Sequence, residues 1–382
     1  MPARPLRDSD IVITDRALIG ALGPDAVTAC AAFRAGLSRA SELDYYDAGG
    51  PSQGGALLRA HSAGGFTHGF VGPARLSRLI AACLRDSAQR ELDVSRTGCF
   101  IALPSPARIL QGALALDELD KREQLLLAAK DARVPSDREY AGAILANGLA
   151  DSPWQRFAKH FVPVTGGHAS VAQACQLASE QLRQGSIDAA MVIAVDSLLD
   201  VDTLDWLNLL KRLKTEDRPA GVVPGEACCS LLLQTAAVAR RHKRQALCVL
   251  DAVGLAAEPR NLLAGQASPG AVMAKLVDDA KQRSSAGPDV TWFLIDHNGE
   301  TARASEWGNS LFHLARRHPD YANAQTWYPA LGFGDTAAAS GGVAACIAIS
   351  AWERGYAPAP TAFICSAADG PERAVLCLES AD

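Results

Sequence analysis

The chain has 382 residues, of which 48% are hydrophobic, and its formal net charge is −5. This composition is typical of a globular protein with a large core, and its mild acidity gives no electrostatic basis for binding nucleic acid. No apolar run reaches the roughly 18–20 residues that cross a bilayer, and residues 1–10 lack the apolar core of a signal peptide. We therefore expect a cytoplasmic protein that contacts neither nucleic acid nor membrane.

Strands and helices alternate in the first part of the chain. The residues at 49–65 are rich in Gly and Ser and predict a loop, while 108–150 predict a charged, mostly helical insertion. We expect strands over 11–14, 97–103, 161–164, 189–195 and 227–234, and helices over 24–36, 76–90, 169–184 and 201–213.

The second part repeats this rhythm. We expect strands over 246–253, 290–295, 361–365 and 373–378, and helices over 269–283, 301–316 and 335–353. The alternation predicts an α/β protein whose mostly parallel sheets are covered on both faces. The similar rhythm of the two parts suggests an internal duplication.

The ten cysteines are another feature of the composition. Their neighbours are mostly apolar, and no pair has the C-x-x-C spacing of a zinc or redox site. This pattern favours small buried hydrophobes in a reducing compartment. We expect neither a metal site nor a cofactor.

Five segments, in the right order, resemble the β-ketoacyl synthases of the thiolase superfamily. They are 11–14, 21–24, 33–38, 178–190 and 218–227. The resemblance implies a duplicated thiolase-like fold, layered α-β-α-β-α, with two mixed, mostly parallel sheets. It implies an N-terminal half over 1–240, with a helical insertion at about 105–158, and a C-terminal half over 241–382. It also implies a dimer that pairs through the strand at 161–164.

The family's catalytic residues are a cysteine and two histidines. The cysteine lies at the N-terminus of a central helix, where the positive end of the helix dipole stabilises a thiolate. Matching the motifs places His168 at the cysteine position and Asn298 and Asp335 at the two histidine positions. The same matching places Gly167 and Ser366 in the substrate-binding region.

His297 is a further candidate for substrate binding, next to Asn298. Adjacent residues on a strand face opposite sides, so only one of these two side chains can point into the site, and we favour Asn298. His168 with Asp335 is either a general base fixed by a carboxylate or a buried polar pair without chemistry. His168, Asp335 and His297 lack the spacing diagnostic of a metal site.

The changed residues argue against condensation, because an acyl-imidazole is labile. The first hypothesis is a degenerate ketosynthase-like partner or accessory subunit, resembling chain-length factors or proteins associated with secretion effectors. The second is a repurposed acyl-thioester hydrolase or acyltransferase that uses His168 with Asp335. The third is a module that binds an acyl chain, coenzyme A or acyl carrier protein. The partner would be a second copy of the chain or a ketosynthase-like subunit.

Overall fold

One ten-stranded sheet dominates the computed structural model, which describes residues 5–49, 57–87, 93–114, 134–150, 152–284 and 292–381. A second sheet contains only β2 (Ser41–Asp47) and β3 (Leu57–Ala60). The strands of the large sheet are β1 (Ile11–Gly20), β4 (Thr97–Ala102), β5 (Val162–Val164), β6 (Ala189–Ser197), β7 (Glu226–Thr235), β8 (Cys248–Ala257), β9 (Trp292–Ile295), β10 (Gln325–Trp327), β11 (Thr361–Ala367) and β12 (Glu372–Ser380).

The large sheet consists of two five-stranded arms that meet at β1 and β8. These two strands are antiparallel and pair only through Val12 with Val249 and Ile13 with Cys248. Outward from this junction, the arms run β1-β7-β6-β4-β5 and β8-β12-β11-β9-β10. In each arm the first two pairings are antiparallel and the next two are parallel. The arms therefore share one topology.

The predicted fold class is confirmed as α/β with a mixed sheet, but parallel pairing does not predominate. A buried strand reads as a continuous apolar run in either direction, so its sequence does not reveal the direction of its neighbours. This is why the antiparallel pairings of β7 and β12 were not predicted.

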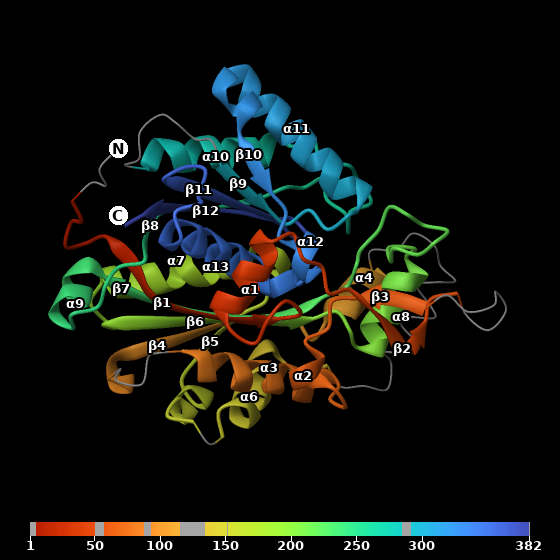
Figure 1. Cartoon of the computed structure of the whole chain (residues 1–382), viewed down its shortest axis with the longest axis horizontal. Coiled ribbons are helices and arrows are strands. Elements are labelled where there is room, and N and C mark those ends of the chain that lie inside the picture. Colours follow the sequence, from red (N-terminus) through yellow and green to blue (C-terminus); the bar gives the residue numbers. More distant parts are fainter. Residues whose placement is uncertain are drawn as a thin grey trace.

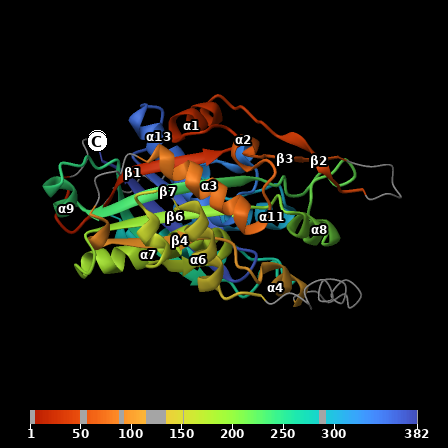
Figure 2. The same ribbon diagram turned by 90° about the horizontal axis from the view of Figure 1, so that it is seen from below.

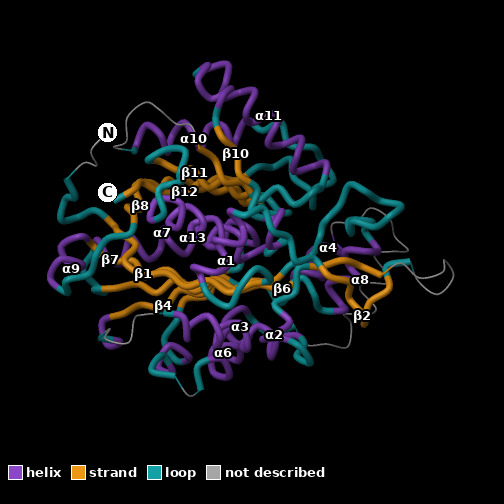
Figure 3. The backbone as a smooth tube through the Cα atoms, in the orientation of Figure 1, coloured by secondary structure: helices purple, strands orange, loops and turns teal. Residues whose placement is uncertain are grey.

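Helices form three layers around the two arms (Figures 1 and 3). α7 and α13 lie between the arms, α10 and α11 cover the outer face of one arm, and α3 and α6 cover the outer face of the other (Figures 1 and 2). The helices are α1 (Ala26–Arg34), α2 (Gly64–Thr67), α3 (Gly72–Asp86), α4 (Arg108–Leu114), α6 (Asp137–Gly148), α7 (Ser170–Arg183), α8 (Val201–Leu209), α9 (Ala236–Arg241), α10 (Ala271–Arg283), α11 (Thr301–Arg317), α12 (Ala330–Phe333) and α13 (Ser340–Glu353).

Small residues allow α13 to lie in the middle layer. Its residues from Gly341 to Ala351 are all buried. A Cβ atom added at Gly342 would lie 2.0 Å from Sγ of Cys229 on β7, so only glycine permits this approach of helix and sheet. The all-round apolar sequence of α13 is therefore the signature of a helix buried on every side.

Several local predictions were wrong or incomplete. The loop predicted over 49–65 contains β3 and the start of α2 in its described part. The helix predicted over 201–213 ends at Leu209, and β2, β10, α9 and α12 were not predicted. The insertion predicted over 108–150 contains α4 and α6, while residues 115–133 lie outside the described residues. Within the described ranges, no helix is long and apolar enough to cross a membrane.

Candidate active site

His168 lies in a short 3-10 turn, Gly167–Ala169, between the end of β5 and the start of α7. Gly167 has a φ of 55°, which an L side chain rarely adopts. A Cβ atom on Gly166 would lie 2.1 Å from the side-chain oxygen of Gln173. The two glycines therefore allow the tight turn that places His168, only 6% exposed, ahead of the central helix.

Asp335 approaches His168 from the second arm. Its backbone is held by two hydrogen bonds, in which its N–H donates to the carbonyl of Val223 and its carbonyl accepts from the N–H of Gly225. Its Oδ1 lies 2.8 Å from Nε2 of His168 and also accepts from the N–H of Ala337 at 2.8 Å. The carboxylate therefore faces the ring across the interface between the arms.

Asn298 completes the contact. It follows β9, is 6% exposed, and donates from Nδ2 to Oδ2 of Asp335 at 2.6 Å. The structure thus brings His168, Asn298 and Asp335 together, as the matched positions predict. His297 is not part of this contact: its ring packs edge-on against that of Tyr328, and its Nδ1 is buried without a hydrogen-bond partner among the described residues.

The second ring nitrogen of His168 is also occupied. Nδ1 lies 3.2 Å from a terminal nitrogen of Arg303 on α11. A guanidinium can only donate, so Nδ1 must accept, and the proton of the neutral ring must lie on Nε2, facing Asp335. In this arrangement neither ring nitrogen is left for a substrate.

Arg303 belongs to a buried ionic cluster that extends away from the ring. It pairs with Asp296 at 3.1 Å and with Asp369 at 2.9 Å, and it donates to the carbonyl of Ala367. Arg212 pairs with Asp369 at 2.7 Å and with Glu300 at 2.7 Å.

The cluster contains four carboxylates and two guanidiniums, so one more positive charge would be stabilised there. The carboxylates are those of Asp296, Glu300, Asp335 and Asp369, and the guanidiniums are those of Arg212 and Arg303.

The cluster shifts the pKa values of its members. Burial raises the pKa of Asp335, but the charges of His168 and Arg303 and the hydrogen bonds that it accepts outweigh burial, so its pKa falls well below the ordinary value. Burial and Arg303 lower the pKa of His168, yet the carboxylate of Asp335 outweighs both, and the net shift is upward. Arg212 and Arg303 likewise hold the pKa of Asp369 low, although burial opposes them. Proton affinity in the site is therefore displaced from the carboxylates to the ring.

A cavity of about 460 Å³ opens beside His168 and Asp335. Its wall includes Gly166 and Gly167 from the turn, so the cavity reaches the N-terminus of α7. The indole nitrogen of Trp206, which also lines the cavity, is buried without a hydrogen-bond partner. The cavity is large enough for part of an organic ligand.

Ser366 does not line this cavity. It is buried on β11 beside a separate small cavity that Asp335 also lines. None of the ten cysteines lines the large cavity, and all ten are buried and without a disulfide. Within the described ranges, no group of three or more His, Cys, Asp or Glu side chains is arranged to hold a metal ion.

Comparison with solved structures identifies the fold. One is a type II polyketide synthase ketosynthase bound to a hexaketide, in complex with its acyl-carrier protein (AntDE:AntF), with 13% identity and a TM-score of 0.74 over 98% of this chain and 100% of that one. Another is the ishigamide ketosynthase/chain length factor, with 17% identity and a TM-score of 0.71 over 98% and 99%. A third is the oxazolomycin ketosynthase domain OzmH KS7 of Streptomyces albus JA3453, with 17% identity and a TM-score of 0.72 over 98% and 76%.

The chain has the thiolase-like ketosynthase fold. At these identities the likeness shows the fold alone. No family model matches the sequence, and no curated protein sequence matches it either. What a ketosynthase-fold chain does with this site must therefore be argued from its own residues.

The arginines of the site were not found from the sequence. Asp296, Glu300 and Asp369 lie within the matched turns, but Arg303 and Arg212 lie outside them. The spacing of Glu300 and Arg303, three residues apart at the start of α11, gives an ion pair at 3.6 Å. Such a pair is commonly a solvated helix contact, so nothing in this spacing predicts that Arg303 reaches the ring of His168.

Proposed function

We propose that this chain is a ketosynthase-like accessory subunit without condensing activity. The observation that carries the proposal is the engagement of both ring nitrogens of His168, one with Asp335 and the other with Arg303. A nucleophile or general base needs a lone pair within reach of the substrate, and this ring has none to offer. The position that a cysteine occupies in the family is occupied here by His168, whose ring makes hydrogen bonds between the two arms.

The remaining polar residues of the cluster do not replace the lost chemistry. Asn298 cannot take up a proton as a histidine does, and Asp335 has a strongly lowered pKa and is therefore a weak base. Cys175, the thiol on α7, is fully enclosed, and burial raises its pKa to about 12. Neither decarboxylation nor acyl transfer has an evident catalyst.

The accessory role includes a dimer, as homodimer or with a ketosynthase-like subunit. β5 is the outer strand of its arm and pairs only with β4 among the described strands. The carbonyl of Val164 accepts a hydrogen bond from the N–H of Leu103, just beyond β4, so the backbone of Val164 faces β4. The backbone of the neighbouring Pro163 therefore faces the free edge, where it offers a carbonyl but no N–H. Pairing across a twofold axis would therefore lack an N–H donor at Pro163.

The repeated topology also supports a division of the chain into halves. We place the boundary near residue 240, at the end of α9, with the insertion over about 105–158 in the first half. In this division the site lies between the halves, since His168 comes from one and Asn298 and Asp335 from the other.

A binding role for the site is the second candidate, and the cavity of about 460 Å³ favours it. An acyl-CoA or an acyl carrier protein arm is the ligand class that the fold suggests, since one neighbour is a ketosynthase in complex with its acyl-carrier protein. Catalysis by His168 would require Arg303 to move away from Nδ1 of the ring, whereas ligand binding requires only the empty volume of the cavity.

Decarboxylation of malonyl-CoA, followed as release of carbon dioxide, tests the first candidate. We expect no release above the buffer rate by the wild-type chain. Release that is lost on Asn298→Ala or Asp335→Ala would contradict the proposal.

Calorimetry with acetyl-CoA tests the second candidate. Ser105 lines the cavity, so Ser105→Trp should fill part of the space and lose any heat of binding.

A further inference from the structure

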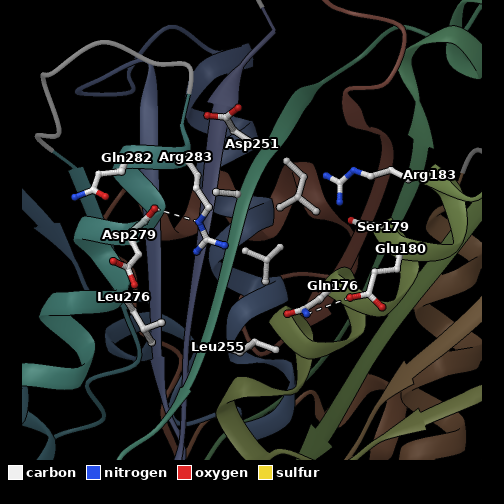
Figure 4. A pocket seen from close by; sticks show the side chains of 13 residues that line it. Gln176, Ser179, Glu180, Arg183, Asp251, Leu255, Leu276, Asp279, Gln282 and Arg283 are labelled. Carbon is white, nitrogen blue, oxygen red and sulfur yellow. Dashed lines mark hydrogen bonds between the residues drawn. The ribbon is translucent and has the colours of Figure 1, made fainter.

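A second cavity of about 770 Å³ follows β8 between α7 and α10 (Figure 4). It shares no lining residue with the cavity beside His168. Gln176, Ser179, Glu180 and Arg183 lie on one side of the strand, and residues of α10 lie on the other, in the view of Figure 4. The cavity is therefore a groove that runs along a strand.

The strand that forms its floor has one free edge. β8 pairs with β12 from Cys248 to Ala257 but with β1 only at its first two residues. From Asp251 onward, no described strand occupies the other edge, and Leu255 in this part is 37% exposed. A free edge offers backbone N–H and carbonyl groups to an incoming strand.

The groove carries unpaired positive charge. In the part of the chain that the structure describes, Arg183 makes no hydrogen bond or ion pair, and Arg283 uses only Nε, which donates to the carbonyl of Asp279 at 3.1 Å. Two of the nearby carboxylates are already engaged, since Glu180 accepts from Gln176 and Asp279 pairs with a lysine. Asp251 lies at the far end of the strand segment from Leu255 (Figure 4). Within the described residues neither guanidinium pairs with a carboxylate, so each can pair with one from outside, although Glu180, Asp251 and Asp279 also line the groove.

A buried hydroxyl in the wall also lacks a partner. Ser179 is only 3% exposed, and its Oγ makes no hydrogen bond. A buried polar group without a partner is uncommon in native structures.

The first arm shows how the same space can be filled. β1 and β8 each have one register irregularity, at Thr14 and at Asp251. Arg16 on β1 and Val253 on β8 each lie two residues after the register irregularity of their own strand. Arg16 crosses to α13, where it donates to Ser350 at 2.9 Å and pairs with the last residue of that helix, Glu353.

At the equivalent place beside β8, the last residue of the helix is Arg183 of α7, which corresponds to Glu353 of α13. The strand residue that faces it is Val253, which corresponds to Arg16 of β1. The cross-groove ion pair is therefore missing, its helix side has the opposite charge, and the space remains open. An acidic side chain from another chain would restore the pair with its polarity reversed.

We propose that this groove binds an extended acidic segment of a partner protein, which adds to the free edge of β8 as a strand. Backbone hydrogen bonds to β8 would supply register, and carboxylates of the segment would pair with Arg183 and Arg283. The apolar residues of the segment would cover Val253 and Leu255. This inference does not depend on any chemistry at His168.

Fluorescence anisotropy tests it with the full chain and a labelled peptide in which two adjacent glutamates, one facing each helix, are flanked by valines. We expect saturable binding that weakens at least about tenfold on Arg183→Glu and with rising salt. The same peptide with lysine for glutamate should not bind. A version with prolines in place of alternate valines keeps the charge but cannot pair as a strand, and it should also fail to bind.

Val253→Arg together with Arg183→Glu copies the first arm into the second and should fill the groove without unfolding the chain. We expect this double variant to melt as the wild type does and to lose peptide binding. On binding to the wild type, the amides of 251–257 should gain protection from hydrogen exchange. No binding of the acidic peptide, equal binding of the proline version, or binding that the double variant retains would each overturn the proposal.

Discussion

Nε2 of His168 lies 2.8 Å from Oδ1 of Asp335, although 167 positions separate the two residues in the chain. Each residue precedes a central helix, α7 in one arm and α13 in the other, so this contact joins the arms at the middle of the molecule. With Arg303 on the other ring nitrogen, the histidine is held on both sides. We propose that it serves as a structural group at this position.

Asp335→Ala should lower the free energy of unfolding by about 3–5 kcal/mol, because it leaves the ring of His168 and the amide of Asn298 buried without the carboxylate that they contact. Urea denaturation of the full chain measures the loss. Asp279→Ala is the matched control, since its ion pair with Lys275 is exposed and should contribute less than about 1 kcal/mol. Equal effects of the two substitutions would show that the central contact is not structural.

The ring of His168 should titrate above its ordinary pKa of 6.5, although burial and Arg303 both oppose protonation, because the carboxylate of Asp335 outweighs them. A raised folded-state pKa means that this group stabilises the fold fully below pH 6.5 and loses that contribution as the pH rises through the folded-state value. Nitrogen-15 NMR of the histidine rings follows the titration. Above it, the ring should be the neutral form with the proton on Nε2, and a proton on Nδ1 would contradict the geometry.

The stability of the protein should also fall in acid. The pKa values of Asp335 and Asp369 lie below their ordinary value, in spite of burial, because of the positive groups beside them. A lowered folded-state pKa contributes stability that is complete above the unfolded pKa of about 4 and is lost as the pH falls below it. Thermal melts between pH 7 and pH 3 should show this loss, and Asp369→Asn should flatten the dependence. An unchanged slope in that variant would contradict the assignment.

The cysteines should resist alkylation in the native protein. All ten are buried, and burial raises the pKa of the thiol of Cys175, for example, to about 12, so little thiolate is exposed to a reagent. Intact mass after iodoacetamide should show essentially no adduct before denaturation and ten adducts after it. Rapid labelling of one native thiol would reveal a reactive cysteine that the described fold does not provide.

Placing a cysteine at the matched position should not restore condensation. In His168→Cys the thiol would gain the positive N-terminus of α7 and the charge of Arg303, so it should alkylate readily. Carbon dioxide release from malonyl-CoA should nevertheless stay at the buffer rate, because no histidine stands at Asn298 and Asp335, the positions that the motifs match to the family's two histidines. His168→Ser is the control for alkylation. Condensation by the cysteine variant would show that the surrounding residues are still competent.

Much of the fold could be predicted from the sequence because its signals are local. The apolar runs of β6 and β7 and the small residues of α13 indicate a layered α/β core directly. The meeting of His168, Asn298 and Asp335 was predicted only through the family resemblance, since nothing local connects the three. Strand direction was predicted as mostly parallel, and the antiparallel pairings of β7 and β12 were missed because burial on both faces removes the pattern that would reveal direction.

The ionic cluster around Arg303 is the part of the site that the sequence does not predict. Arg303 reaches Asp296, Asp369 and the ring of His168 through the packing of α11 against the ends of β9 and β11, and no periodicity in the sequence encodes that packing. The open groove along β8 is likewise visible only when the two arms are compared in space. Both features depend on tertiary contacts between segments far apart in the chain.

Incubation of the purified chain with acetyl-, malonyl- and longer acyl-CoA, followed by intact mass and thioester turnover beside His168→Ala, tests the central claim most directly. We predict no adduct and no turnover in either protein, because both ring nitrogens are engaged within the structure. Turnover or a transient adduct that disappears in His168→Ala would contradict the account and show that the histidine works as a catalytic residue.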